Sequence, residues 1–365
     1  MKAAVLHESG SPLKVTEVSS PPLRSSSVRV RVLATHILSF TNQVVGGQFP
    51  FPLPTPYTPG LCAIGFVEDL ADDVSGLTVG QKVFCSPLVS SRNNSGEPER
   101  ILKGWFGMTA NCQDLLDLWK EGTFAEQADF PVECITPIDL IGDDYDNSQL
   151  ACMYYLCIAY GAFLRGEFKP GQSVLINGAT GNLGTASVLT ALAMGASRVY
   201  AAGRNLSVLE SLTELDPLRV QSVPLPQREE EYGSTLSKQV KQVDIMIDAV
   251  GIIDSPSLVE AGLSVLRQGG TAVLLGGVAA NVHLSYLMTL VKELNIKGSS
   301  MYPSSAPSDI VRMIHSGALN LRAFRPKTYP LELINEAIAA ASGSRGLDYS
   351  ILVPWQGDQE QEESR

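Results

Sequence analysis

A glycine-rich turn between an apolar strand and a helix constrains the fold of this chain more than any other feature. Residues 173–177 (SVLIN) have the character of a buried strand, and residues 185–195 that of a closely packed helix. A second apolar strand, 198–202, follows within about 30 residues, as a βαβ unit requires. Glycines permit a tight turn and let backbone N–H groups approach a pyrophosphate, and the helix N-terminus adds partial positive charge. We therefore predict a dinucleotide site here; the alternative is a purely structural turn. The predicted cofactor-binding residues of the turn are Gly178, Ala179, Thr180, Gly181, Asn182, Leu183 and Gly184.

The residues after the second strand indicate which dinucleotide binds. They are Gly203, Arg204 and Asn205, where an NAD site usually has an acidic residue for the ribose hydroxyls. A carboxylate would repel a 2′-phosphate, whereas Arg204 can bind it through charge-assisted hydrogen bonds or stack on adenine. We therefore predict NADPH as the cofactor. The alternative is that Arg204 is an ordinary solvated arginine at a strand end.

Two later strand ends are expected beside the same cofactor. Residues 243–251 resemble a buried parallel strand with its turn, 257–266 a helix, and 271–277 another buried strand. Ligands of such sheets lie beyond the carboxyl ends of the strands. This predicts Val250 and Gly276 as cofactor neighbours, although glycines in this region could also serve only to make turns.

The composition limits the class of protein. A chain of 365 residues is long for one core, so two domains are expected. Its 44% hydrophobic and 18% charged residues suit a soluble enzyme, and the net charge of −11 argues against nucleic acid as a partner. The N-terminus turns polar too soon for a secretory signal and no apolar run could cross a bilayer, so we expect no membrane and a cytoplasmic location. The six cysteines lack paired zinc-type spacing and are expected to be reduced.

The first part of the chain differs from the rest. Short alternating or β-branched runs at 3–6, 13–18, 27–33, 65–70 and 82–86 are separated by glycine and proline clusters, which indicates a β-rich domain. From about residue 149 the pattern changes to alternating helices and strands, as in an α/β domain.

With these motifs the chain resembles the medium-chain dehydrogenase/reductase superfamily over nearly its whole length. The likeness is carried by the glycine turn together with MKAAV at 1–5, PG at 59–60, GQKV at 80–83, GTFAE at 122–126, KPG at 169–171 and DAVG at 248–251. It implies an α/β fold: a Rossmann doubly wound parallel sheet at 139–299 plus a GroES-like β-rich catalytic domain at 1–138, completed by 300–365. It also implies a small-molecule substrate bound between the domains, and a homodimer paired through the edge strand of the Rossmann sheet near 273–290.

Many members of this superfamily hold a catalytic zinc, and here the ligand positions are altered. The matching positions contain Leu38, Leu61 with its neighbour Cys62, and Tyr154. Two leucines have no donor atoms, and one thiol cannot supply three ligands, so we predict no metal. The four-cysteine structural zinc lobe is also missing, since 86–122 contains only Cys112. The closer resemblance is to the zinc-free quinone oxidoreductase and enoyl reductase branch, from which the insertion at about 89–122 departs; it could be a lid, a dimer contact or a remnant of the zinc lobe.

Loss of the zinc changes which reaction is expected. Alcohol oxidation without a Lewis acid loses its main stabilisation of the alkoxide. Hydride addition to a conjugated enone leaves charge spread over an enolate, which a few hydrogen-bond donors can hold. We therefore expect NADPH-dependent reduction of an activated C=C bond or a quinone. The alternatives are a metal-independent carbonyl or alcohol oxidoreductase, and an NADPH-binding protein without catalysis.

Residues near the altered zinc positions are the candidates for catalysis and substrate binding. Tyr154 is the first candidate donor, because it stands in place of a metal ligand, followed by Thr41 and Ser39. Packing with a satisfied hydroxyl is the alternative for Tyr154, as core packing is for Phe40. The predicted substrate-pocket residues are Phe40, Tyr155, Met301 and Tyr302.

Overall fold

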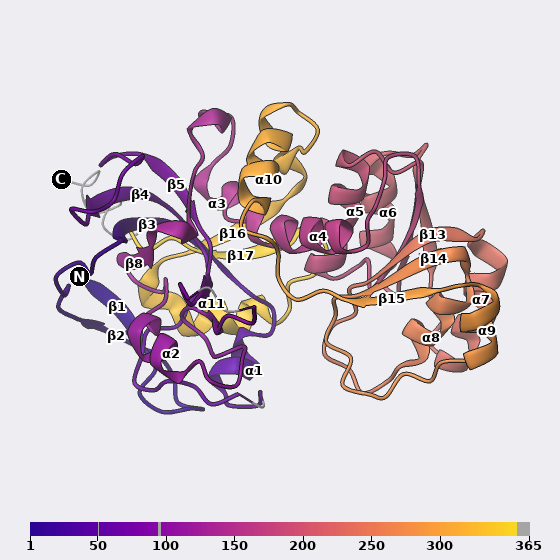
Figure 1. Cartoon of the computed structure of the whole chain (residues 1–365), viewed down its shortest axis with the longest axis horizontal. Coiled ribbons are helices and arrows are strands. Elements are labelled where there is room, and N and C mark those ends of the chain that lie inside the picture. The colour runs from indigo at the N-terminus through magenta and orange to yellow at the C-terminus, as the bar shows by residue number, and fades with distance from the viewer. Residues whose placement is uncertain (50, 94–95, 356–365) are drawn as a thin grey trace.

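The computed structural model describes residues 1–49, 51–93 and 96–355, which form two lobes joined side by side (Figure 1). The lobe at one end contains both the N-terminal strands and the last strands of the chain, and the other lobe contains the middle of the sequence (Figure 1). Within the described ranges, no helix is both long and apolar enough to cross a membrane.

The middle of the chain builds a six-stranded parallel sheet. Its strand order is β12-β11-β10-β13-β14-β15, so that the first strand lies at the centre and the connections run outward to both edges. This is the doubly wound arrangement whose ligands bind where the strand order reverses, between β10 and β13. The strands are β10 (Ser173–Asn177), β11 (Arg198–Gly203), β12 (Val220–Pro224), β13 (Val243–Asp248), β14 (Leu266–Leu274) and β15 (Asn295–Gly298).

Helices cover both faces of this sheet because its strands are apolar on both faces. In β10, Leu175 belongs to the hydrophobic cluster under α7 and α8, whereas its neighbours Val174 and Ile176 belong to the cluster under α4, α5 and α6. Such two-sided burial explains the nearly continuous apolar runs seen in the sequence. The helices are α4 (Met153–Arg165), α5 (Asn182–Ala193), α6 (Leu206–Leu215), α7 (Tyr232–Gln239), α8 (Ser257–Ser264) and α9 (Tyr286–Val291).

The other lobe is a β-rich body that uses both ends of the chain. Its sheet has the order β16-β17-β3-β4-β5-β9, and β8 also pairs with β3. The C-terminal strand β17 pairs antiparallel with β3, with Ile351 opposite His36. The strands of this sheet are β3 (Ser27–Ile37), β4 (Ala63–Leu70), β5 (Lys82–Cys85), β8 (Gln127–Pro131), β9 (Ile135–Pro137), β16 (Arg325–Tyr329) and β17 (Asp348–Leu352). Shorter elements complete the lobe and its junction: β1 (Lys2–Val5), β2 (Lys14–Glu17), α1 (Thr41–Val45), α3 (Asn147–Leu150), α10 (Ala306–His315) and α11 (Ile334–Ala341).

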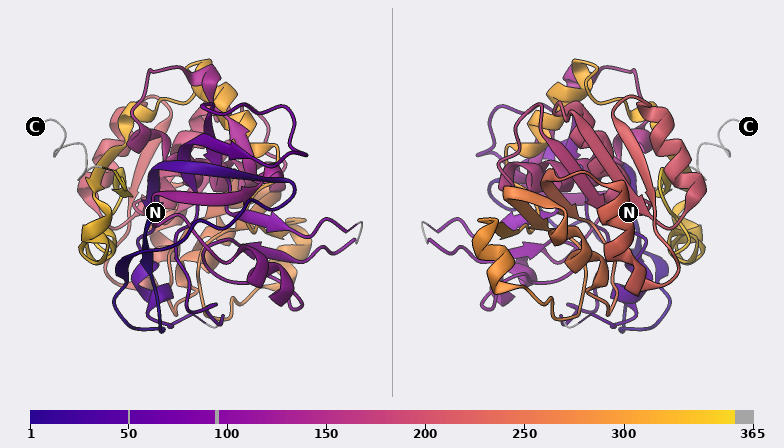
Figure 2. Two further views of the ribbon diagram at one scale, coloured as in Figure 1. Left: turned by 90° about the vertical axis from the view of Figure 1, so that its left-hand side faces the viewer. Right: turned by 90° about the vertical axis from the view of Figure 1, so that its right-hand side faces the viewer.

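The insertion at 89–122 folds into a hairpin and a helix on the side of the β-rich lobe. The hairpin consists of β6 (Leu88–Ser90) and β7 (Arg100–Leu102), and the helix α2 spans Gln113–Trp119. Figure 2 shows the hairpin extending from the body of the molecule. The insertion therefore has its own secondary structure and its own contacts to the lobe.

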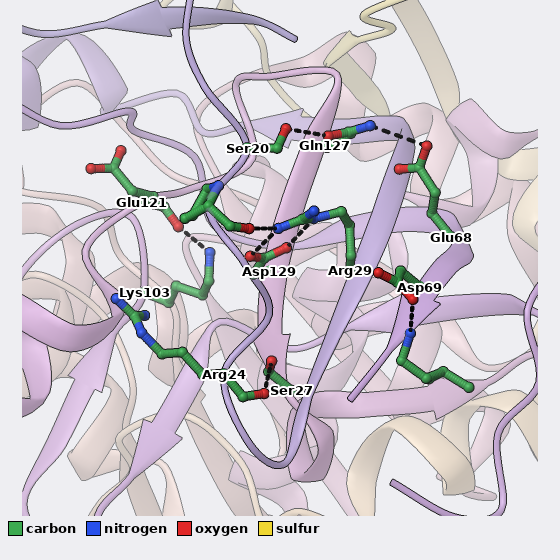
Figure 3. Close-up of polar contacts among 12 residues, drawn as sticks. Ser20, Arg24, Ser27, Arg29, Glu68, Asp69, Lys103, Glu121, Gln127 and Asp129 are labelled. Carbon is green, nitrogen blue, oxygen red and sulfur yellow. Dashed lines mark hydrogen bonds and ion pairs between the residues drawn. The ribbon is translucent and has the colours of Figure 1, made fainter. Parts of the chain in front are cut away.

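A buried lysine fixes the base of this insertion. Lys103, only 1% exposed, donates from Nζ to the backbone carbonyl of Glu121, close to the ion pair of Arg29 and Asp129 (Figure 3). Its Nζ also lies 4.4 Å from the centre of the Phe130 ring, a cation–π distance. Burial lowers the pKa of Lys103 to about 8. Contacts with the ring and the carbonyl thus compensate part of the cost of burying this ammonium group.

Candidate active site

The glycine turn predicted from the sequence joins β10 to α5 in a backbone path that side chains would block. Gly178 has φ +71°, which favours glycine, and a Cβ on Gly184 would lie 2.1 Å from the Gly178 carbonyl oxygen. The N–H of Ala179 donates to the carbonyl of Ala202 at 2.9 Å, which holds the turn against β11. The first turn of α5 therefore lies directly on the glycine turn at the carboxyl end of the sheet, the geometry that suits a pyrophosphate.

The next strand end has the same close packing and presents Arg204 to solvent. A Cβ on Gly203 would lie 2.4 Å from Cγ2 of Thr180, so the ends of β10 and β11 contact each other there. Asn205 caps α6, since its Oδ1 accepts from the N–H of Val208 at 3.2 Å. Arg204 is exposed between them, at the carboxyl end of the sheet.

The loops after β13 and β14 also meet at this edge. A Cβ on Gly276 would lie 2.3 Å from the carbonyl oxygen of Val250, and the N–H of Gly277 donates to that carbonyl at 2.9 Å. Beneath them the Asp248 carboxyl is buried, and this burial raises its pKa to about 7. Its Oδ1 and the Oδ1 of Asn177, its neighbour across the strand pair, have no hydrogen-bond partner among the described residues. The four strand ends predicted to contact cofactor thus lie along one edge.

The side chain of Asn182 connects the glycine turn to the other lobe. Its Nδ2 donates to the carbonyls of Gly346 at 3.0 Å and Asp348 at 2.8 Å, in the segment leading into β17. The hydroxyl of Tyr349 donates back to the Asn182 carbonyl at 3.0 Å, and the N–H of Gly346 donates to Thr180. The amide nitrogen of Asn182 therefore joins the two lobes, which leaves its backbone for a cofactor. No local pattern in the sequence marks Gly346 or Tyr349 as the partners.

The residues at the altered zinc positions are buried together. Leu38, Leu61, Cys62 and Tyr154 all belong to one hydrophobic cluster, and each is at most 2% exposed. Burial raises the pKa of the Cys62 thiol to about 12, so the thiol is neutral at physiological pH. The described residues contain no group of three or more His, Cys, Asp or Glu side chains that could hold a metal ion. Because apolar side chains replace the donors, this arrangement does not fit a catalytic zinc.

Of the candidate donors, Tyr154 is a member of this cluster, and Ser39 and Thr41 closely follow its member Leu38 in the chain. Thr41 begins α1, is 1% exposed, and its Oγ1 has no hydrogen-bond partner within the described ranges. Ser39 is partly buried two residues earlier in the chain. Tyr154 lies near the start of α4, with its ring 5.7 Å from that of Tyr155. Of these, the Thr41 hydroxyl is a buried polar group still without a partner, a condition that proteins rarely leave unexplained.

The predicted substrate-pocket residues come from different elements but pack in or against one hydrophobic cluster. The ring of Phe40 is partly buried and lies 5.3 Å from the ring of Trp105 in the insertion. Tyr302 is buried, and its hydroxyl shares a 3.0 Å hydrogen bond with Ser86. Met301 has φ +61°, and its carbonyl packs against Gly161 of α4 so closely that a Cβ there would lie 2.7 Å away. All of these residues contact the same hydrophobic cluster as Leu61.

Two family models match most of the chain. The family model described as the alcohol dehydrogenase GroES-like domain matches residues 24–139, and the one described as zinc-binding dehydrogenase matches 183–316. The chain belongs to the medium-chain dehydrogenase/reductase superfamily. The α/β fold expected from the sequence, a Rossmann-type parallel sheet with a GroES-like domain, is confirmed.

Individual relatives of the superfamily are distant but span the chain. An alcohol dehydrogenase of Moraxella sp. (strain TAE123) is 26% identical over 340 residues, 92% of this chain and 94% of the relative. A quinone oxidoreductase of Homo sapiens is 24% identical over 363 residues, 95% and 96% of the two chains. A thermostable alcohol dehydrogenase from Pyrobaculum aerophilum has a TM-score of 0.74 at 21% identity, covering 97% and 99%, which shows the shared fold. The chain is thus an oxidoreductase of a superfamily that uses pyridine nucleotides, NAD(H) or NADP(H), on small molecules.

The buried tyrosines near the altered zinc positions have raised pKa values. Burial raises the pKa of Tyr154 well above its ordinary value, and it does the same for Tyr155 and Tyr302. A tyrosine with a raised pKa keeps its proton and donates a hydrogen bond, but it transfers that proton less readily. This favours stabilisation of an oxyanion over proton transfer from Tyr154.

A buried histidine lies beside one of these tyrosines, Tyr155, and beside Tyr349. The ring of His36 contacts Tyr155 edge-on at 5.0 Å and Tyr349 at 4.8 Å. Burial lowers the pKa of His36 to about 3, and its Nδ1 lacks a hydrogen-bond partner in the described part of the chain. His36 is therefore neutral at physiological pH and packs as an aromatic ring. A lone histidine within an apolar strand gives no sequence signal that distinguishes this role from catalysis.

Proposed function

We propose that this oxidoreductase uses NADPH to reduce an activated C=C bond, as in an enone or enoyl group, or a quinone, without zinc. The observation that carries the proposal is the replacement of metal donors by Leu38 and Leu61, buried in one hydrophobic cluster with Tyr154. With no Lewis acid, the site suits a reaction whose negative charge is delocalised. The quinone oxidoreductase relative supports the reaction class at the level of overall likeness.

The cofactor-binding side follows from the glycine packing. The backbone of residues 178–184 and the N-terminus of α5 would hold the pyrophosphate, and Arg204 the 2′-phosphate, while Val250 and Gly276 would line the nicotinamide end. NADPH, when bound, supplies a hydride. The exposed guanidinium of Arg204, without an acidic residue beside it in the Gly203-Arg204-Asn205 segment, supports NADPH over NADH.

The protein's part in the chemistry is to orient the acceptor and to hold its oxygen. The Thr41 hydroxyl, which has no hydrogen-bond partner among the described residues, would donate to the oxygen on which negative charge develops, with Tyr154 and Ser39 as further donors. A buried tyrosine with a raised pKa serves this purpose without giving up its proton. Solvent would then protonate the enolate carbon. The same pKa direction disfavours a carbonyl reductase in which Tyr154 is the acid.

A homodimer is proposed with this function. The strand β15 pairs only with β14 among the described strands, so its other edge is open, and α9 beside it exposes Tyr286, Leu287, Leu290 and Val291. Open edges and apolar patches of this kind are usually covered in solution. Sedimentation velocity at micromolar concentration would show a dimer, and a monomer would contradict this part of the proposal. The cytoplasmic location and the domain boundaries expected from the sequence stay predictions.

The experiment that tests the function is NADPH oxidation with a panel of conjugated enones and quinones, with products identified by mass spectrometry. The same protein is assayed for bound zinc. A saturated ketone or a hydroquinone from zinc-free protein is the expected result. An alcohol product would establish carbonyl reduction instead, and NADPH binding without turnover on every acceptor would support a non-catalytic protein.

A further inference from the structure

Four aromatic side chains form a closed cycle of contacts beside the candidate donors. The ring of Phe40 lies 5.8 Å from Phe49 and 5.3 Å from Trp105, and Phe106 lies 6.1 Å from Phe49 and 5.6 Å from Trp105. Phe51 stacks on the outside of Phe106 at 4.7 Å and 18°. We refer to these five residues as the aromatic cluster. Its members come from two separate segments, 40–51 around the candidate donors and 105–106 of the insertion.

The cluster runs from the protein surface to a buried tryptophan. Phe51 is 41% exposed, Phe40 and Phe49 are partly buried, and Trp105 is 2% exposed. Phe40 immediately precedes Thr41, whose hydroxyl has no hydrogen-bond partner in the described part of the chain. The cluster therefore connects an exposed ring, Phe51, to the buried Trp105, and one of its members, Phe40, is the chain neighbour of the proposed oxyanion donor.

Trp105 carries a second unpartnered donor. Its Nε1 is buried and has no hydrogen-bond partner among the described residues. Indole N–H groups buried in proteins usually find an acceptor, and an orphaned buried donor calls for an explanation. A ligand oxygen that enters the aromatic cluster would provide this acceptor.

The backbone holds Trp105 in place close to the altered zinc positions. Gly104 has φ +74°, and a Cβ there would lie 1.9 Å from the Gly60 carbonyl oxygen and 2.7 Å from Cα of Gly122. On the other side of Gly104, Lys103 is fixed to the Glu121 carbonyl (Figure 3). Trp105 thus extends from a rigid base next to Leu61, the residue that follows Gly60.

We propose that the aromatic cluster is the specificity-determining wall of the active site, and that it selects flat acceptors whose reacting C=C bond is conjugated to an aromatic ring. The ring of the acceptor stacks on the cluster, and an oxygen substituent on that ring accepts a hydrogen bond from Trp105 Nε1. This gives the insertion a role in substrate recognition. The inference rests on the proposed function, because it names the class of acceptor for the same site.

Two matched tryptophan variants test this role. Trp105→Phe keeps an aromatic ring but removes the N–H donor, whereas Trp119→Phe makes the same change in α2, where Trp119 packs under the Arg24 guanidinium in a different hydrophobic cluster. The probes are 4-(4-methoxyphenyl)-3-buten-2-one and the aliphatic enone 3-penten-2-one. The quantity compared is the ratio of their kcat/KM values.

The wild-type protein should prefer the aryl enone, and Trp105→Phe should lower the ratio roughly tenfold, the effect of one lost hydrogen bond. Trp119→Phe should keep the wild-type ratio. A wild-type ratio near one, or equal changes in the two variants, would overturn the proposal.

A binding measurement separates this inference from the proposed reaction. The chain has three tryptophans, and the saturated ketone 4-(4-methoxyphenyl)-2-butanone cannot accept hydride at a C=C bond. In the presence of NADP⁺ it should quench the fluorescence of Trp119→Phe, which retains Trp105, and leave Trp105→Phe largely unquenched. If this pattern appears while no enone is reduced, the proposed function fails and the binding wall stands. If the fluorescence of both variants is quenched alike, the aromatic cluster does not bind the acceptor in the way proposed, whichever reaction the enzyme catalyses.

Discussion

The two sides of the candidate active site are determined by different parts of the chain. On the cofactor side, backbone atoms pack against backbone atoms: Gly184 against Gly178, and Gly276 against Val250. On the substrate side, side chains from distant segments meet, as when Phe40 contacts Trp105 across 65 positions of sequence. The cofactor side is therefore encoded locally by glycines, whereas the substrate side depends on how the insertion docks on the lobe.

This difference explains how the two sides should respond to mutation. Backbone packing without space for a Cβ cannot adjust to a larger residue, because no side chain is present to change rotamer. A cluster of aromatic side chains can repack and retain part of its function. Substitutions of the closely packed glycines on the cofactor side should thus have all-or-none effects, and substitutions on the substrate side graded ones.

The largest effect is expected for Gly184→Ala. Its new Cβ would lie 2.1 Å from the Gly178 carbonyl oxygen, so the turn or α5 must move. We expect a loss of about 3 kcal/mol or more in the free energy of unfolding and no measurable NADPH binding. Chemical denaturation and a cofactor fluorescence titration would measure the two.

Gly181→Ala is the matched control for this prediction. The atom nearest to its Cβ would be 3.5 Å away, and its φ of −85° suits any residue. The apo protein should keep nearly wild-type stability. If the Gly181 and Gly184 variants unfold alike, the close backbone approach does not determine the stability of the turn.

A second prediction concerns the substrate side and the Thr41 hydroxyl. Thr41→Val keeps the shape of the side chain but removes the proposed donor to the oxyanion, so kcat should fall about 100-fold, with the Kd for NADPH unchanged. Single-turnover rates of enone reduction would measure this.

Tyr154→Phe should lower kcat by a smaller factor, about tenfold. An unchanged kcat in either variant, with native cofactor affinity, would remove that residue from the mechanism.

The difference between local backbone packing and long-range side-chain contacts also explains how well the sequence predicts each side of the site. The turn, the order of strands and helices after residue 173 and the edge at Val250 and Gly276 could be predicted, because periodicity and glycine spacing are local signals. The strand β14 nevertheless begins at Leu266, earlier than the expected 271, and α8 ends at Ser264. A continuous apolar run gives poor boundaries between a buried helix and a buried strand.

The contacts between segments could not be predicted. Nothing near Asn182 in the sequence indicates that its amide binds the carbonyls of Gly346 and Asp348, more than 160 residues away. Trp105 is likewise an unremarkable residue in an insertion until the fold brings it to Phe40. Such contacts depend on the pairing of β17 with β3 and on the docking of the insertion, both of which are long-range.

A third prediction concerns Arg204, the exposed side chain on the cofactor side. Its substitution should have a graded effect on NADPH binding, unlike substitution of the closely packed glycines. Arg204→Ala removes the exposed cation after β11 without affecting any close backbone contact. The KM for NADPH should rise by a factor of about 10 or more, since a charge-assisted contact to the 2′-phosphate is lost. The KM for NADH in the same variant is the internal control and should change little. Equal changes for both cofactors would show that Arg204 does not read the 2′-phosphate.

The smallest expected effect is on the pH dependence of the free energy of unfolding. It compares one buried titratable group from each side of the site. The pKa of Asp248 is raised to about 7 and that of His36 is lowered to about 3, both by burial. For Asp248 the folded state holds more protons than the unfolded state between about pH 4 and 7, so its contribution to stability falls as pH rises. For His36 the unfolded state holds more protons between about pH 3 and 6.5, so its contribution rises with pH.

The two slopes should largely cancel from pH 4 to 6.5, leaving a net fall of about 0.5 kcal/mol between pH 6.5 and 8, where the loss from Asp248 exceeds the remaining gain from His36. Asp248→Asn should abolish this fall, since a neutral amide needs no desolvated charge and can donate to the orphaned Oδ1 of Asn177. Without the opposing contribution of Asp248, the contribution of His36 should become visible, so that the free energy of unfolding of the variant rises from pH 4 to 6.5. Urea denaturation at intervals of half a pH unit would measure both slopes, with the exposed Asp254→Asn as the control. If the stability curves of Asp248→Asn and wild type are parallel, Asp248 is ionised in the folded protein throughout this pH range. In that case contacts on the cofactor side compensate the cost of burying its charge.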